Sequence, residues 1–526
     1  MTDPQPASAS ASTTTADEHH PPRVIGGLGA FTLVAGSMIG VGVFIFLDEI
    51  AAGMGTLPLF FGMLLLGGFF ALCGAVACGE LGAMMPKAGG DYVFQRAAYG
   101  RSIAFASGWV LFAAIFAGSN AALSIAVFQY EIGPLLGIDM SAKLAGITYA
   151  QLGAIGLLVL LTLINDLGAA LSAKAQTLLT LAPMALMLAL GAYVLIAQPT
   201  VVHPPTGDEL GTLPATLTLA GLATAFLNVN FIFSGWINII YVAAEVKNPG
   251  RNVPRSMLSA TGAVTGLYIL LAAVFVAVLG FQGVASSGSP ALGFDAGTRT
   301  ANALGAGNLA PLILLIITMA IITSVNATVM AGARVGYAMA KDGAFWKPMG
   351  VLSGKRRVPR RALWFGTLLA ALIVLSGTAE AIAEMTSLAM FVTGSLTVAA
   401  VFVLRKKMPD APRPYRATAY PILPGIYILL AVLAIAAKLA NAVEKPGLEA
   451  WYPLIGLGIL GVTWVGHLLY VRRWKSAAVV AVGFVLGGAV FQSFTRPATE
   501  AHAAPLTGAT PAATVDGHSD GRHLQP

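Results

Sequence analysis

The sequence predicts an all-α membrane protein whose helices cross the bilayer many times. Only 10% of its 526 residues are charged, whereas soluble domains carry about a quarter. Apolar stretches of roughly 20 residues, the length of a bilayer-crossing helix, recur along the chain. Lysine and arginine gather in the connections on one side of these stretches, as they do in cytoplasmic loops. The net charge of +7 is therefore attributed to basic loops, and nucleic acid is not an expected partner.

The apolar stretches predict about twelve spans, each placed to within several residues. They are 26–47, 57–80, 102–130, 146–165, 176–198, 215–243, 257–281, 306–333, 362–378, 383–404, 421–441 and 452–471. A further apolar run at 476–494 is either a thirteenth span or a helix lying at the membrane surface. The chain is thus divided into a membrane domain at 23–472, an extra segment at 473–495, and tails at 1–22 and 496–526 that are expected to be disordered.

The distribution of basic residues predicts the orientation. When the N-terminus is placed in the cytoplasm, nearly all lysines and arginines of the membrane domain fall on the inner side. The exceptions on the outer side are Lys143, Arg299, Lys438 and Lys445. The tail at 1–22 is therefore expected to be cytoplasmic.

Two of the spans are interrupted by small residues. The first reads VAGSMIGVGVFIF at 34–46, and the sixth reads NVNFIFSGWINIIY at 228–241. The glycines of the first span also fit close helix packing, because Gly36 and Gly40 have small-xxx-small spacing. The break in the sixth span, at Ser234 and Gly235, favours a different interpretation. Interrupted helices five spans apart are typical of transporters built from two inverted five-helix repeats.

The chemistry of such breaks indicates a ligand. Unwound backbone is tolerated in a membrane where its N–H and C=O groups line a cavity. Free N–H groups attract an anion such as a carboxylate, and free carbonyl groups attract a cation such as an ammonium. An α-amino acid carries both groups, so the pattern predicts an amino acid binding site.

Four motifs resemble the amino acid–polyamine–organocation (APC) transporter superfamily. They are GSMIGVGVF at 36–44, ELGAMMPKAGGDYVFQRAAYG at 80–100, FIFSGWINIIYVAAEVKNPGRNVPRS at 231–256 and RKKMPDAPRPYRATAYPILP at 405–424. The similarity covers roughly residues 23–472 and is strongest to bacterial relatives of the L-type amino acid transporters. The resemblance implies two inverted five-helix repeats with a discontinuous first and sixth helix, two further helices, and transport of amino acids or polyamines by alternating access.

The resemblance also implies roles for individual residues. The substrate carboxylate would meet backbone N–H groups of the first span, and the ammonium would meet carbonyl groups of the sixth. Phe231 matches the aromatic residue that closes over bound substrate, and Ser234 lies where small residues set the room for the side chain. The substrate-binding residues expected on this basis are Ser37, Ile39, Gly40, Val41, Gly42, Phe231, Ile232, Phe233, Ser234 and Trp236.

The sequence says less about the charge of the substrate and the ion that drives transport. The first, third, sixth and eighth spans contain no charged residue, and no carboxylate facing the site is evident, which favours a neutral amino acid. Pro183 occupies the position at which many relatives carry a coupling lysine. A sodium site would draw on hydroxyls such as those of Thr323, Ser324 and Thr328, although such residues also serve helix packing.

Two glutamates, Glu80 and Glu245, lie beside basic loops. They are expected either to form interfacial ion pairs or to act as an inner gate.

Several alternatives compete with a secondary transporter of neutral amino acids. A membrane enzyme is disfavoured because the chain lacks HExxH, GxSxG and any buried cluster of histidine with carboxylates. A channel would need rings of charge or a filter loop. Two alternative functions remain: a polyamine or cationic amino acid antiporter, and an amino acid sensor on the same fold.

No cofactor and no resident metal are expected. The expected partners are the substrate and the lipid of a bacterial cytoplasmic membrane, and a homo-oligomer is left open.

Overall fold

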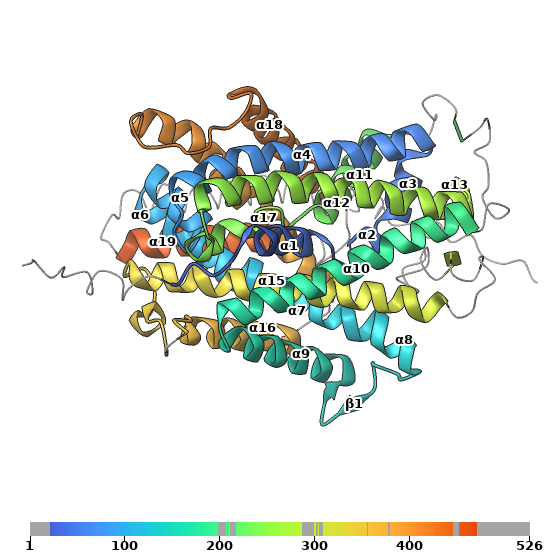
Figure 1. The fold of residues 1–526 in the computed structure, drawn as a ribbon, viewed down its shortest axis with the longest axis horizontal. Coiled ribbons are helices and arrows are strands. Elements are labelled where there is room, and N and C mark those ends of the chain that lie inside the picture. Colours follow the sequence, from blue (N-terminus) through green and yellow to red (C-terminus); the bar gives the residue numbers. More distant parts are fainter. Residues whose placement is uncertain are drawn as a thin grey trace, which may run out of the picture.

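The computed structural model describes residues 21–40, 42–197, 207, 209–210, 217–286, 299–300, 303, 309–354, 356–376, 379–444 and 452–470. Within these residues the protein is a bundle of long helices lying side by side (Figure 1). The strands found there are β1 (Lys143–Leu144) and β2 (Ile147–Thr148), which pair antiparallel with Lys143 opposite Thr148. The predicted all-α class is therefore confirmed, while the run at 476–494 and both predicted tails lie outside the described residues.

The helices follow one another along the chain and differ widely in length. They are α1 (Gly27–Met38), α2 (Gly42–Ile45), α3 (Leu47–Met54), α4 (Leu57–Met84), α5 (Asp91–Tyr99), α6 (Arg101–Trp109), η2 (Val110–Phe116), α7 (Ala117–Ala126), η3 (Val127–Ile132), α8 (Gly133–Leu136), α9 (Tyr149–Asp166), α10 (Ala169–Ala197), α11 (Leu219–Ile232), η4 (Asn238–Glu245), α12 (Pro249–Leu279), α13 (Phe281–Ala285), α15 (Leu309–Lys341), η6 (Lys347–Gly350), α16 (Arg360–Ser376), α17 (Ala379–Lys407), α18 (Ile422–Glu444) and α19 (Tyr452–Tyr470). The segments η2 and η3 are π-helical, whereas η4 and η6 are 3-10 helices.

Membrane-spanning length and hydropathy are confirmed for part of the predicted set. Among the described residues, 8 helices are long and apolar enough to cross a bilayer. They are Leu57–Met84, Arg101–Ile132, Tyr149–Asp166, Ala169–Val194, Pro249–Leu279, Pro311–Lys341, Leu388–Lys407 and Ile422–Ala440. Shorter apolar helices occupy Gly27–Met38, Gly221–Ile232 and Leu460–Leu469, so the first and sixth predicted spans contain helices too short to cross on their own.

Local sequence explains several helix starts and corrects one expectation. Thr148 caps α9 by a reciprocal pair of hydrogen bonds with Gln151, the capping-box arrangement. From the sequence, Pro249 and Pro254 would end the sixth span and shape the following loop. Instead Pro249 opens α12 and Pro254 lies inside it. Proline suits a first helical position because its fixed φ is helical and its missing N–H would have no partner there.

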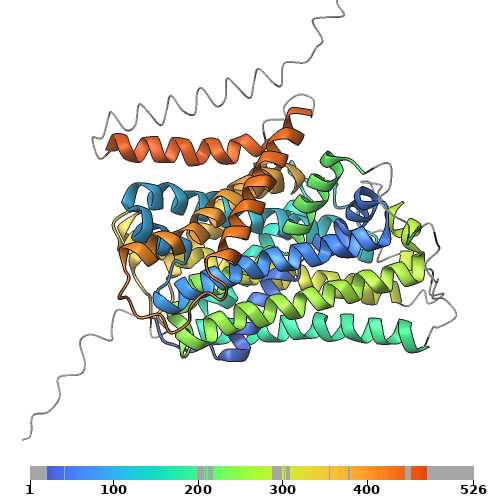
Figure 2. The same cartoon turned by 90° about the horizontal axis from the view of Figure 1, so that it is seen from above.

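Glycines allow the central helices to approach closely. The short α1 lies in the middle of the bundle, packed by α10, α12 and α15, while α4 runs along α12 (Figure 1). A Cβ atom on Gly68 would press against Thr265, and one on Gly82 would press against Val253, both on α12. In the perpendicular view α19 runs along one side of the bundle, where it packs on α6 and α17 (Figure 2).

Candidate binding site

The first apolar helix stops in the middle of its predicted span. After Met38 the backbone of Ile39 is extended, with φ −73° and ψ 95°, and helix resumes only in α2. Two carbonyl groups at the end of α1 find other donors. The Ser324 hydroxyl donates to the Ser37 carbonyl oxygen over 3.3 Å, and the Tyr268 hydroxyl donates to the Met38 carbonyl oxygen over 2.7 Å. These bonds serve carbonyl groups that a helix end leaves without intrahelical partners.

The sixth predicted span is broken beside the first. The helix α11 ends at Ile232, a turn follows, and the chain continues as η4. Gly235 lies in this turn with φ +103°, a conformation that residues with side chains rarely adopt. A Cβ atom on Gly235 would clash with the backbone of Ser37 at the end of α1. The two breaks are therefore in direct contact, and the contact requires glycine.

Tyr268 of α12 connects the two breaks. Its side chain is fully buried, and besides bonding Met38 its hydroxyl oxygen lies 3.4 Å from the carbonyl oxygen of Ile232. Its ring packs edge-to-face on Phe233, with the ring centroids 5.2 Å apart. One side chain thus supports the ends of both α1 and α11.

Replacing Tyr268 with phenylalanine is expected to lower stability. The change removes the donor to the buried Met38 carbonyl group, and an unsatisfied buried acceptor costs about 1–3 kcal/mol. The midpoint of thermal unfolding of the detergent-purified protein should fall. Tyr149→Phe is the matched control, because that side chain is 41% exposed, and it should melt like the wild type. Equal melting of Tyr268→Phe and wild type would contradict the assigned role.

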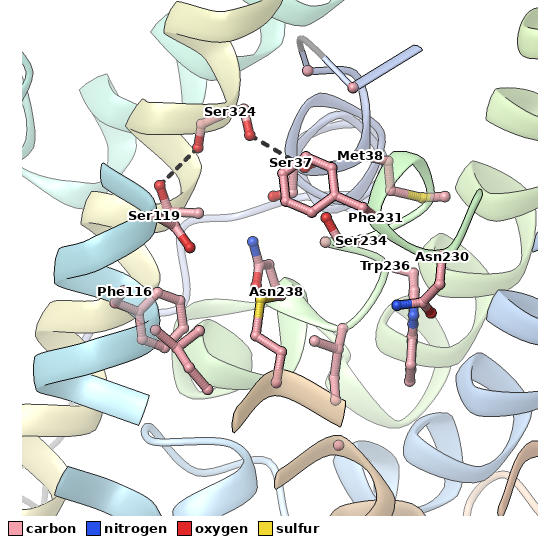
Figure 3. Close-up of a pocket in the computed structure, with 18 of the residues that line it drawn as sticks. Ser37, Met38, Phe116, Ser119, Asn230, Phe231, Ser234, Trp236, Asn238 and Ser324 are labelled. Carbon is pink, nitrogen blue, oxygen red and sulfur yellow. Dashed lines mark hydrogen bonds between the residues drawn. The ribbon is translucent and has the colours of Figure 1, made fainter. Parts of the chain in front are cut away.

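A cavity of about 150 Å³ lies where the two breaks meet. At about 30 Å³ for each water molecule in the liquid, it has room for roughly five of them, and hence for a small organic ligand. Figure 3 shows Phe116 and Ser119 on one side of the space and Asn230 and Trp236 on the other. The polar side chains of the lining include Ser37, Ser119, Asn230, Ser234, Asn238, Ser324 and Thr328.

Most of the predicted binding residues belong to this lining. They are Ser37, Gly40, Gly42, Phe231, Ile232, Ser234 and Trp236, and the predicted coupling residue Ser324 joins them. Ile39 and Phe233 are buried outside the lining, and Val41 is not among the described residues. The ring of Phe231 packs edge-to-face on Phe46, with centroids 5.4 Å apart, at the wall of the cavity.

One expectation about charge is wrong. No carboxylate was expected at the site, yet Asp91 of α5 belongs to the cavity lining and is only 2% exposed. The hydroxyl of Tyr241, on η4, donates to its Oδ2 over 2.8 Å. The sequence gives no sign of this placement because Asp91 lies in the connection between two predicted spans. The fold turns that connection back toward the cavity.

The predicted sodium-site hydroxyls are engaged within the protein. The Thr323 hydroxyl contacts the carbonyl oxygens of Met319 and Leu179 at 2.7 and 2.6 Å, and Thr323 is not in the cavity lining. The Thr328 hydroxyl lies beside Asn120 Oδ1 and 2.9 Å from the carbonyl oxygen of Ser324. Within the described ranges, no group of three or more histidine, cysteine, aspartate and glutamate side chains is placed to hold a metal ion.

Two buried glutamates form ion pairs at the end of the bundle that carries the basic connections. Glu245 receives two hydrogen bonds from Arg334 of α15, over 2.9 and 3.1 Å, and the two side chains are 3% and 2% exposed. Glu80 of α4 accepts hydrogen bonds from the guanidinium groups of Arg405 and Arg413 and from the backbone N–H of Ala417. The expected ion pairs of Glu80 and Glu245 are therefore present.

Backbone bonds join two distant segments at the same end. The N–H of Ile25 donates to the Glu245 carbonyl oxygen over 2.9 Å, and the N–H of Lys247 donates to the Ile25 carbonyl oxygen over 2.8 Å. This parallel bridge between Ile25 and Val246 ties the start of α1 to the end of η4. Together with the Glu245–Arg334 pair, it holds the start of α1, the end of η4 and α15 together at this end of the bundle.

Several residues of the site were not predicted from the sequence. Asn230 and Asn238 had a detectable signal, since they are polar residues within an apolar span beside the break. Four other lining residues had no such signal in the sequence: Phe116, Ser119, Met390 and Tyr427. Which face of their helices points to the cavity depends on tertiary packing. Tyr268 likewise resembles any other aromatic residue of an apolar helix.

The chain is similar in sequence to known amino acid transporters. A serine/threonine exchanger of Bacillus subtilis, SteT, is 27% identical over 450 residues, covering 83% of this chain and 96% of that protein. The human large neutral amino acids transporter small subunit 2 is 25% identical over 448 residues, covering 84% and 81% of the two chains. The human b(0,+)-type amino acid transporter 1 is 24% identical over 432 residues, covering 82% and 85%. The family model described as amino acid permease matches residues 25–464, and the chain therefore belongs to the amino acid permease family.

Proposed function

We propose that this permease exchanges neutral amino acids across the bacterial cytoplasmic membrane by alternating access. The observation that carries the proposal is the cavity at the junction of two broken helices, with both breaks in its lining. Backbone groups released at such breaks are the groups that can bind the two charged ends of an amino acid. Membership of the permease family gives the same class of substrate.

The substrate is oriented by the main chain in this proposal. Its carboxylate binds at the backbone amides around Gly40, Val41 and Gly42, with the Ser37 hydroxyl nearby. Its ammonium binds at the carbonyl groups of Phe231, Ile232 and Phe233. The side chain then extends into the space bounded by Phe116, Trp236 and Asn238, and Phe231 closes over it. At the end of α1 the carbonyl groups of Ser37 and Met38 are engaged by the hydroxyls of Ser324 and Tyr268.

The proposed architecture is two inverted five-helix repeats followed by two helices, giving twelve spans in all. The order of the helices supports it: the broken α1–α3 and the broken α11–η4 each open a series of five spans, and α18 and α19 follow. In this arrangement the segment 23–472 is the transporter domain. The basic end is cytoplasmic, and the N-terminus lies there too.

A neutral substrate is favoured because the carboxyl group in the cavity lining is buried. The carboxyl group of Asp91 is almost fully buried and is held by Tyr241, so it does not present an open anionic surface to a cationic side chain. The relatives named for serine and threonine and for large neutral amino acids favour the same class. The b(0,+)-type relative keeps cationic amino acids as the alternative to be tested.

In the proposed cycle the basic end acts as the inner gate. Opening toward the cytoplasm separates η4 from α15, which breaks the Glu245–Arg334 pair and the bridge at Ile25. Glu80 anchors the loop before α18 against α4 and keeps that side fixed. Supporting these roles, both ion pairs lie at helix ends where the connections carry the basic residues.

Counterflow into proteoliposomes tests the proposed function. Vesicles loaded with unlabelled L-serine should accumulate labelled L-serine above its external concentration, since exchange couples efflux to uptake. L-threonine and L-leucine should compete, whereas L-lysine and putrescine should not. Protein-free vesicles and vesicles without internal serine are the controls. Binding of labelled serine without counterflow would indicate a sensor, and competition by lysine or putrescine would indicate a cationic substrate.

A further inference from the structure

The carboxyl group of Asp91 lines the cavity but has no role in the proposed binding scheme. It stands at the start of α5, directly after Gly89 and Gly90, whose φ values are +107° and +48°. A Cβ atom on Gly90 would press against the ring of Tyr241, so the glycine allows η4 to approach Asp91. The chain thus builds a tight, specific contact around this carboxyl group.

Asp91 is incompletely satisfied in this position. Tyr241 donates to Oδ2, but Oδ1 is buried and has no hydrogen-bond partner among the described residues. The nearby Thr397 hydroxyl is engaged elsewhere: it lies 3.1 Å from the Thr393 carbonyl oxygen and accepts a hydrogen bond from Gln95. A buried, half-satisfied carboxylate costs free energy unless it binds a cation or a proton.

Charged neighbours within the described part of the chain do not supply that cation. The titratable groups that face Asp91 from packed elements are Tyr241, Cys78 of α4 and Tyr427 of α18, and each is neutral in its ordinary state. Four basic side chains on the surrounding helices bind other groups. Their pairings are Arg334 with Glu245, Arg405 with Glu80, Arg96 with Asp342, and Lys407 with the Ala98 carbonyl oxygen. Two others, Arg101 and Lys406, are exposed. Oδ1 itself is enclosed by protein atoms, so a proton fits it better than a metal ion.

We propose that Asp91 binds one proton when substrate enters the cavity and releases it when substrate leaves. Asp91 lies in the cavity lining and is 2% exposed, so a bound substrate that covers it removes its remaining contact with solvent and favours the neutral acid. The step is the reversible addition of a proton to Oδ1, with no other bond changed. Because linkage is reciprocal, the proton also strengthens substrate binding. Net uptake of substrate then carries one proton with it, whereas one-for-one exchange carries none.

The chemistry of the site supports this assignment. Burial raises the pKa of the Asp91 carboxyl to about 7, while the hydrogen bond from Tyr241 acts to lower it. Below this pKa the group is neutral and ready for bound substrate; above it, substrate must pull a proton from solution. Substrate affinity is therefore expected to fall as the pH rises through neutrality.

Proton uptake on substrate binding tests the inference, which rests on the proposed function. Purified protein in weakly buffered detergent solution with a pH indicator dye receives saturating L-serine near pH about 7.5, above the pKa. The wild type should remove protons from solution, and Asp91→Asn should remove none. Tyr241→Phe removes the donor to Oδ2, so its window of proton uptake should move to higher pH.

Glu131 of η3 supplies the matched control. It is also a buried carboxyl group without a hydrogen-bond partner among the described residues, but it lies outside the cavity lining. Glu131→Gln should take up protons like the wild type. If the wild type performs serine counterflow but takes up no protons when serine binds to the purified protein, or if Asp91→Asn takes up as many protons as the wild type, the inference fails while the proposed function stands. Absence of counterflow itself would instead count against the proposed function.

Discussion

Replacing Gly235 with alanine is expected to abolish transport almost completely. The new methyl group would meet the backbone of Ser37, and alanine would have to adopt φ +103°. Backbone strain of this kind costs about 1–3 kcal/mol before the clash is counted. Relieving it requires the two helix breaks to separate, which displaces the groups proposed to hold substrate. A loss of serine counterflow of at least about tenfold should follow, since about 1.4 kcal/mol corresponds to a factor of ten.

Gly266 provides the control for this substitution. It lies within α12, and a Cβ atom there would meet nothing within 4 Å. Alanine is favoured over glycine inside a helix by about 0.5–1 kcal/mol, so Gly266→Ala should transport like the wild type and melt no lower. Normal counterflow by Gly235→Ala would show that contact between the breaks is not needed for the carrier to work.

Replacing Glu245 with glutamine is expected to cause the largest loss of stability. The change leaves the Arg334 guanidinium group buried at 2% exposure with its carboxylate partner gone. Breaking one side of a buried ion pair in this way costs about 3–5 kcal/mol. The thermal midpoint in detergent should fall, and counterflow should fall with it because the proposed inner gate loses its side-chain ion pair.

A rescue variant and a surface control accompany this substitution. The double variant Glu245→Gln, Arg334→Gln removes both charges and should recover much of the lost thermal midpoint. Asp342→Asn breaks the partly exposed pair with Arg96, and exposed pairs contribute about 0–1 kcal/mol, so it should melt near the wild type. If Glu245→Gln melts and transports like the wild type, the pair neither stabilises nor gates the protein.

The sequence predicted the binding site where that site interrupts an otherwise regular apolar helix. Small residues at 36–42 and at 234–235 interrupt spans that are otherwise strongly apolar, and the helices do end there. These interruptions are local, so they can be recognised without knowing what packs around them. Most of the binding residues predicted from them line one cavity.

The remaining features depend on contacts distant in sequence. Tyr268 reaches the Met38 carbonyl group across 230 positions, and no local pattern encodes that bond. The sequence places Arg334 in a basic loop, but α15 continues to Lys341 and carries it inward to Glu245. Asp91 lies outside every predicted span, so its position gives no hint of the cavity. In each case tertiary packing decides the role of a residue whose type alone is ambiguous.

The backbone bridge at Ile25 and Val246 tolerates different substitutions from the ion pair beside it. Main-chain hydrogen bonds do not depend on the side chain, so substitutions other than proline at Ile25 leave the two bonds available. The Glu245–Arg334 pair beside them depends wholly on side chains. In the proposed inner gate, substitution of Glu245 or Arg334 would therefore weaken the ion pair while the main-chain bridge remains.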